Sequence, residues 1–114
     1  MFESQFYILK DILVVRLKGE LDQLETEGLK RKLNEMIYQK KIKNIIFNMK
    51  DLEFMDSSGI GVIIGRYYQI KSQGIIILCE IKGELKRLIN LSGLLRICQI
   101  KDNEQMALWY LGSH

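Results

Sequence analysis

The sequence contains no proline, one histidine and two cysteines. The histidine is the last residue, His114, so a serine elsewhere in the chain has no nearby imidazole to act as the base of a catalytic triad. Cys79 and Cys98 each stand in an apolar stretch and form neither a disulfide framework nor a zinc-ligand spacing. They are typical of buried thiols in a reducing compartment.

The sequence also lacks a long hydrophobic run and an excess of charge of one sign. No apolar segment is long enough to cross a bilayer, and the opening MFESQFYILK lacks the pattern of a signal peptide. Seventeen basic and fourteen acidic residues give a net charge of +3, and the basic residues are scattered around the chain. We therefore expect a cytoplasmic protein that neither binds nucleic acid nor inserts into a membrane.

The chain does contain enough apolar residues, 47% of 114, for one globular domain spanning 1–114. Their spacing predicts strands at 6–9, 12–17, 44–49, 75–79 and 96–100, and helices at about 23–40, from Ser57 to Gly74, around 85–89 and after Asp102. Residues 50–56 are expected to form a loop. This order predicts an α/β fold, with a mixed sheet of about five strands and about four helices.

Two residues in this pattern are predicted to mark helix ends. Asp22, followed three positions later by Glu25, resembles a capping box at the start of the first helix. Gly74 stands where a residue with positive φ would end the second helix.

The stretch MDSSGIGVIIGRY, residues 55–67, gathers an aspartate, two serines and three glycines at the start of the second helix. A serine nucleophile is disfavoured, because the base is missing and the glycine pattern of a nucleophile elbow is absent. Gly59, Gly61 and Gly65 loosely imitate a nucleotide-binding turn. However, Gly61 and Gly65 fall inside the helix, where their spacing favours close packing of the helix on the sheet. The acidic pair of a magnesium-binding receiver domain is also missing.

A phosphorylation switch requires fewer functional residues elsewhere in the chain than these alternatives. A hydroxyl at the first residue of a helix is exposed, although Ser57 also has a purely structural use as an N-cap worth about 0.5–2 kcal/mol. A phosphate there adds about −1.5 to −2 charges, which the helix amino terminus partly stabilises. We expect the fold to survive this change and the docking of a partner to fail.

The residues that carry this motif also match a known family. MDSSGIGVIIGRYYQIKSQG (55–74), with LKGELD (17–22) before it and LINLSGLLRICQI (88–100) after it, closely resembles the sporulation anti-sigma factor antagonists. These proteins belong to the STAS domains, which occur in bacterial anti-anti-sigma factors and in sulfate transporters. The similarity extends over nearly the whole chain, and one point of departure is the pair Gln23 and Leu24, where the family favours more polar residues.

The resemblance implies a STAS-type switch protein that is not an enzyme and needs no cofactor or metal. When unphosphorylated, such a protein binds an anti-sigma factor that is also a serine kinase with a bound adenine nucleotide, and this binding releases the sporulation sigma factor. The kinase uses ATP to phosphorylate the first serine of the motif, which is Ser57 here. A membrane-associated serine phosphatase removes the phosphate.

The resemblance also assigns roles to other residues of this sequence. Asp56, Ser58 and Gly59 are implied to shape the turn presented to the kinase. Asp22 matches an acidic position near the partner interface, although its use as a helix cap is an equal alternative. Two further positions, Ile60 and Arg66, are contact candidates, and Ile60 has a second possible place in the core.

Two other functions stay open at this point. A STAS antagonist of the general stress pathway would share the fold and the switch but meet a different kinase, and IIGRYYQIK (63–71) favours sporulation. A small nucleotide-binding or hydrolytic protein would instead use the glycines of the motif.

Overall fold

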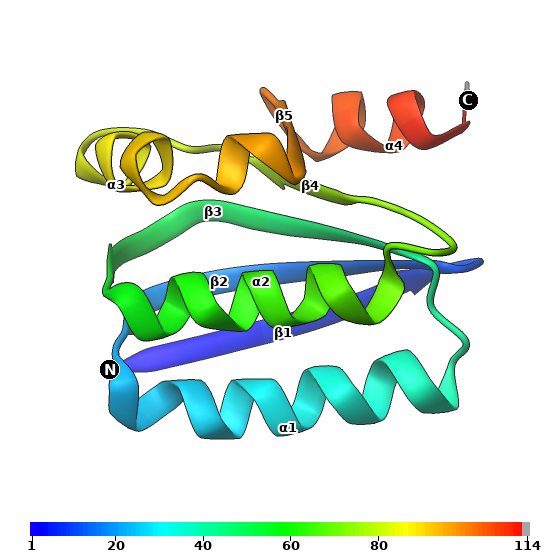
Figure 1. The fold of residues 1–114 in the computed structure, drawn as a ribbon, viewed down its shortest axis with the longest axis horizontal. Helices are drawn as coiled ribbons and strands as arrows, with labels where there is room; N and C mark the ends of the chain where they lie inside the picture. Colours follow the sequence, from blue (N-terminus) through cyan, green and yellow to red (C-terminus); the bar gives the residue numbers. More distant parts are fainter. Residues whose placement is uncertain (113–114) are drawn as a thin grey trace.

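The computed structural model describes residues 1–112, which form one five-stranded sheet in the order β1-β2-β3-β4-β5 (Figure 1). The strands are β1 (Phe2–Leu9), β2 (Ile12–Leu21), β3 (Asn44–Met55), β4 (Ile76–Cys79) and β5 (Cys98–Lys101). β1 and β2 form an antiparallel hairpin, whereas β2, β3, β4 and β5 run parallel to their neighbours. The predicted mixed sheet of five strands is confirmed.

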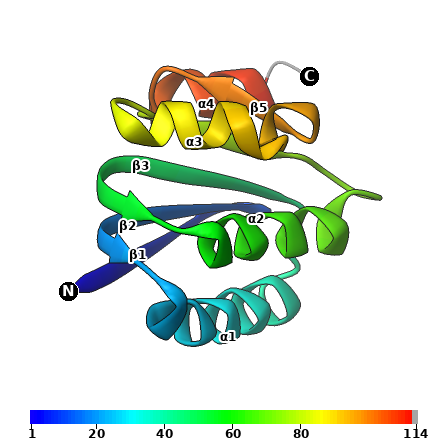
Figure 2. The ribbon, with the colours of Figure 1, turned by 60° about the vertical axis from the view of Figure 1, so that its left-hand side comes forward.

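Helices cover both faces of this sheet, but unequally. The helices are α1 (Gln23–Gln39), α2 (Ser57–Ile70), α3 (Glu84–Ser92), the short 3₁₀ helix η1 (Leu94–Arg96) and α4 (Glu104–Gly112). Residues of α1, α2, α3 and η1 share the larger hydrophobic core with the strands, whereas α4 packs on a smaller cluster that contains Val14, Ile46 and Ile77. Figures 1 and 2 both show α1 and α2 side by side. The two helices therefore lie together on the face opposite α4.

The third strand is longer than its sequence pattern indicates. The segment 50–55 was expected in a loop, but it continues β3 as far as Met55 and places Leu52 and Met55 in the core. The pairing of β3 with β2 shifts register twice, between Arg16 and Lys18 and between Gly19 and Glu20. Such bulges insert extra residues into one strand and interrupt the alternation by which a strand is recognised. The prediction of a loop was therefore wrong.

Helix ends and the amino-terminal strands also differ in detail from the predictions. β1 and β2 extend beyond the predicted 6–9 and 12–17, and β5 begins two residues after the predicted strand because η1 takes up residues 94–96. α2 ends at Ile70, and Gly74 is not among the glycines with positive φ. Gly74 is instead needed for close approach, since an added Cβ would overlap the carbonyl oxygen of Lys43.

The closing helix, predicted to follow Asp102, is capped by the next residue, Asn103. The side-chain oxygen of Asn103, rather than that of Asp102, accepts a hydrogen bond of 2.9 Å from the backbone N–H of Met106. Within residues 1–112, no helix combines the length and apolar character needed to span a membrane.

Candidate functional site

The amino termini of α1 and α2 meet at one edge of the sheet. β2 and β3 are parallel, and their last residues, Leu21 and Met55, are paired in register. The next residue of each strand, Asp22 or Asp56, caps the helix that follows, and the backbone N–H of Asp56 donates to the carbonyl of Leu21 at 3.3 Å. The topology therefore places the two predicted acidic site residues beside each other.

Asp56 is the N-cap of α2 and holds Ser58 through two hydrogen bonds. One oxygen of its carboxylate accepts the backbone N–H of Ser58 at 2.9 Å and also accepts the Ser58 hydroxyl. The bond from the Ser58 hydroxyl lowers the pKa of Asp56, and backbone N–H groups of Ser58, Gly59 and Gln23 act in the same direction against the opposing effect of burial. Asp56 is therefore an ionised acceptor fixed at the helix entrance.

Ser57 lies at the first residue of α2 and has an exposed side chain. The interpretation of Ser57 as the N-cap is wrong, because Asp56, one residue earlier, provides that function. Among the described residues the Ser57 hydroxyl has no hydrogen-bond partner. The motif thus contains one accessible, unengaged hydroxyl and one hydroxyl bonded to a carboxylate.

Gly59 allows α2 to approach the sheet closely. An added Cβ would overlap Cγ of Met55 and lie 3.2 Å from Cδ2 of Leu21. In contrast, a Cβ at Gly61 or Gly65 would meet no atom within 4 Å. The expectation that Gly61 and Gly65 pack the helix on the sheet was therefore wrong, and Gly59 has that role.

Asp22 caps α1 as the sequence predicts. Its carboxylate accepts the backbone N–H of Leu24 at 3.0 Å and that of Glu25 at 3.2 Å, and its side chain is half-buried. The structural use of Asp22 is confirmed, and its use at a partner interface stays a prediction.

Two predicted contact residues have little surface to offer. Ile60 is 7% exposed and belongs to the larger core, and Arg66 is 6% exposed. Two nitrogens of the Arg66 guanidinium, Nε and Nη1, are buried without a hydrogen-bond partner, and burial lowers the pKa of this side chain. Because their side chains are covered, neither residue is placed to contact a partner directly.

A groove of about 430 Å³ runs between the first turns of α1 and α2. α1 contributes Gln23, Thr26, Glu27 and Lys30, and α2 contributes Ser58, Gly61 and Val62. Because Gly61 has no side chain, a partner could approach the backbone of α2 at this place. Sequence reasoning missed the contribution of α1, which arises from the parallel arrangement of two segments far apart in the chain.

The amino terminus of α2 is poorly suited to hold a nucleotide phosphate. The backbone N–H groups of Ser58 and Gly59 already have acceptors on Asp56: Ser58 donates to the side chain, and Gly59 donates to the carbonyl at 3.1 Å. A phosphate cradle needs these groups free, and the Asp56 carboxylate would repel the anion. Among residues 1–112, no cluster of three or more potential ligands is placed to hold a metal ion, and His114 lies outside the described residues.

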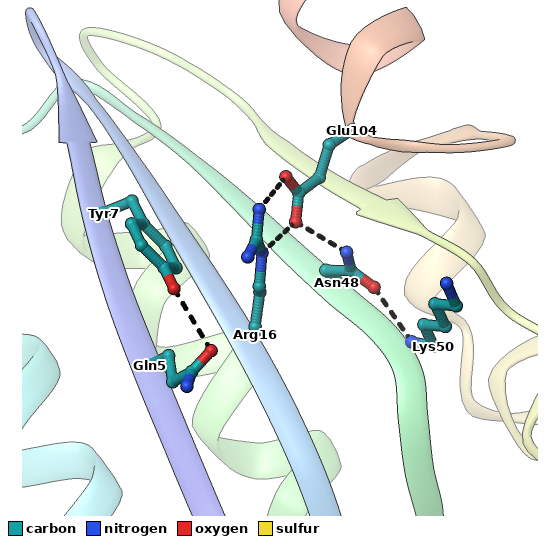
Figure 3. A network of polar contacts seen from close by, with 6 residues as sticks. All are labelled: Gln5, Tyr7, Arg16, Asn48, Lys50 and Glu104. Carbon is teal, nitrogen blue, oxygen red and sulfur yellow. Dashed lines mark hydrogen bonds and ion pairs between the residues drawn. The ribbon is translucent and has the colours of Figure 1, made fainter.

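A second polar cluster lies on the opposite face of the sheet, where α4 begins (Figure 3). Arg16 of β2 donates from Nε and Nη2 to the two carboxylate oxygens of Glu104 at 2.7 and 2.9 Å, and Asn48 of β3 donates to Glu104 at 2.6 Å. The backbone N–H of Lys50 donates to the side-chain oxygen of Asn48. These bonds join α4 to two strands, and no local sequence signal predicts them because Arg16 and Glu104 are 88 positions apart.

Comparison with known proteins assigns this arrangement to a family. A family model described as the STAS domain matches residues 3–107. The chain belongs to the STAS family. The anti-sigma F factor antagonist of Paenibacillus polymyxa is 40% identical to this STAS domain over 100 residues, which cover 87% of the chain and 86% of the relative. The anti-sigma-B factor antagonist of Bacillus subtilis is 34% identical over 87 residues, which cover 75% and 78%. The protein is thus an anti-sigma factor antagonist of the STAS type.

Solved structures agree with this assignment. The anti-sigma factor antagonist SpoIIAA in its unphosphorylated form aligns over 100% of both chains, with a TM-score of 0.79 and 27% identity. The phosphorylated form of SpoIIAA, the Bacillus cell fate determinant, aligns over 96% of this STAS domain and 99% of that chain, with a TM-score of 0.77 and 30% identity. Both forms of that relative share the fold of this STAS domain.

Proposed function

We propose that this STAS domain is an antagonist controlled by phosphorylation at Ser57. In the unphosphorylated form it binds an anti-sigma factor serine kinase with its bound adenine nucleotide, and the sporulation sigma factor is released. Transfer of phosphate from ATP to Ser57 ends the binding, and a serine phosphatase restores it. The antagonist is a substrate of both partners and has no catalytic role of its own.

One observation carries this proposal: of the two serine hydroxyls in the motif, that of Ser57 alone is exposed and unengaged among the described residues. A kinase needs access to the acceptor oxygen, and a side chain at the first position of a helix stands clear of the backbone hydrogen bonds that follow it. The positive end of the helix dipole also tolerates the added charge.

The proposed contact surface surrounds the groove between α1 and α2. It includes Asp22, Asp56, Ser57 and Ser58, together with the turn that Gly59 permits. Ile60 and Arg66 are left out of this surface because their side chains are buried. A phosphate at Ser57 places a dianion next to the Asp56 carboxylate, so a partner that fits the neutral serine meets bulk and concentrated negative charge.

The sporulation pathway is favoured over the general stress pathway by the higher identity to an anti-sigma F factor antagonist, 40% against 34%. We place the protein in the cytoplasm, where ATP is available to the kinase and free thiols such as Cys79 and Cys98 are maintained. Competition between the anti-sigma F and anti-sigma-B kinases for the purified antagonist would separate the two pathways.

Calorimetric titration with the cognate anti-sigma kinase and ADP tests the proposal. Ser57→Ala should bind nearly as tightly as the unmodified chain, whereas Ser57→Asp should bind about tenfold or more weakly because it adds charge at the contact surface. Ser72→Asp is the matched control, since Ser72 is exposed beyond the other end of α2. Tight binding of ATP or GTP in the absence of the kinase would instead favour the nucleotide-binding alternative.

A further inference from the structure

We propose that Asp56 determines which of the two adjacent serines receives the phosphate, as a positioning residue that withholds Ser58 from the kinase. This inference rests on the proposed function and adds to it the basis of site selection. Ser57 and Ser58 are chemically identical and are neighbours in the chain. Their surroundings differ in two respects: Ser57 is exposed whereas Ser58 is half-buried, and the Asp56 carboxylate engages only the second serine.

Asp56 accepts one more hydrogen bond from Ser58 than helix capping requires. A single bond from the backbone N–H of Ser58 already satisfies the capping role of Asp56. Asp22 caps α1 in the same extended conformation through two backbone N–H groups, and the residue two positions after it is Leu24, which has no hydroxyl. The added bond from the Ser58 hydroxyl to Asp56 is therefore specific to this motif.

Phosphoryl transfer to Ser58 requires the hydrogen bond between its hydroxyl and Asp56 to break. A serine oxygen attacks the γ-phosphorus of ATP, the new O–P bond forms as the bond to the β-phosphate oxygen breaks, ADP leaves, and the serine proton passes to a base on the kinase. Ser58 would have to give up a charge-assisted hydrogen bond before reacting. Within residues 1–112, the exposed Ser57 hydroxyl has no such bond to break.

A carboxylate that accepts a serine proton could instead activate that serine as a general base. The geometry at Asp56 does not favour this role, because the same oxygen is held by the Ser58 backbone N–H and the carboxylate faces the helix entrance. The lowered pKa of Asp56 further reduces its strength as a base. Activation and withholding predict opposite outcomes when Asp56 is removed, so the two roles are separable.

The test measures the ratio of phosphate on Ser58 to phosphate on Ser57 by tandem mass spectrometry, after incubation with the cognate kinase and ATP. The unaltered chain should carry phosphate on Ser57. In Asp56→Gly the ratio should rise about tenfold or more, because a strong hydrogen bond to a charged acceptor is lost while glycine still serves as an N-cap. Because the ratio is internal to each sample, weaker kinase binding by the variant does not change its meaning.

Matched variants separate a role of Asp56 in choosing the serine from a general destabilisation of the domain. Asn103→Gly removes the side-chain cap of α4 on the opposite face and should leave the ratio unchanged. Asp56→Ala provides a second variant without an acceptor, and circular dichroism checks that each variant is folded. Ser57→Ala should stay nearly unphosphorylated, whereas the double variant Ser57→Ala/Asp56→Gly should accept phosphate on Ser58.

The outcomes distinguish this inference from the proposed function. A chain that takes no phosphate on either serine contradicts the proposed function. Phosphate on Ser57 of the unaltered chain, with an unchanged ratio in the folded Asp56 variants, overturns the selection role and leaves the switch intact. If the unaltered chain carries phosphate mainly on Ser58 and the Asp56 variants lose it, Asp56 activates Ser58 as a base. That result would also overturn the inference.

Discussion

At the scale of single residues, the motif separates functions that its sequence presents together. Asp56 caps the helix, and Ser58 donates to that cap. Ser57 has no hydrogen-bond partner in the part of the chain that the structure describes, and Gly59 lets α2 pack closely on the strands. The sequence predicts that a hydroxyl, a carboxylate and a glycine belong to this turn. It does not reveal which serine bonds to Asp56, because that depends on the position at which the helix begins.

Gly59 and Gly61 offer a matched pair of substitutions. Gly59→Ala should reduce the free energy of unfolding by about 1–3 kcal/mol, because the new methyl group overlaps Met55 and forces repacking. Gly61→Ala meets open space in a helix and should increase it by up to about 1 kcal/mol. Urea denaturation of both variants measures the difference, and equal effects at the two positions would contradict the assigned packing.

At the scale of secondary-structure elements, the spacing of apolar residues predicted the helices and strands that depend on the local sequence. The apolar positions of α1, with Asp22 before them, gave the observed helix to within one residue of each end. The end of β3 was missed because its bulges mix polar and apolar residues without alternation. The Arg16–Glu104 pair was also missed, since only the folded sheet brings β2 to the start of α4.

Glu104 should make the attachment of α4 dependent on pH. Arg16, through its hydrogen bonds, is the main cause that lowers the pKa of Glu104, and Asn48 contributes in the same direction. A carboxylate whose pKa is lowered by folding stabilises the fold above its unfolded pKa of about 4.3, and this stabilisation is lost as the pH falls through the folded value. Glu104 is 19% exposed and Arg16 is 47% exposed, so solvent screening reduces the effect.

Glu104→Gln should therefore lower the free energy of unfolding at pH 7 by about 1 kcal/mol. The difference from the unaltered chain should shrink as the pH falls below about 4. Glu27→Gln is the control, because the one ion pair of Glu27 among residues 1–112 is an exposed pair with Lys30 on the surface of α1. Chemical denaturation over a pH series checks this, and a difference that grows toward acid would contradict the network.

At the scale of the whole molecule, the switch requires a fold that does not respond to the modification. The larger core lies beneath α1, α2 and α3, whereas Ser57 is exposed at the entrance of one helix. A phosphate changes the net charge from +3 to about +1 and concentrates that change at one edge of the sheet. The effect should therefore appear in docking rather than in the backbone.

The most direct test of this account is the affinity of the kinase for the chain phosphorylated stoichiometrically on Ser57, compared by calorimetry with that of the unmodified chain. The account predicts a loss of roughly 100-fold, because like charge and bulk are placed within the proposed contact surface. Equal affinity of the two forms would contradict it.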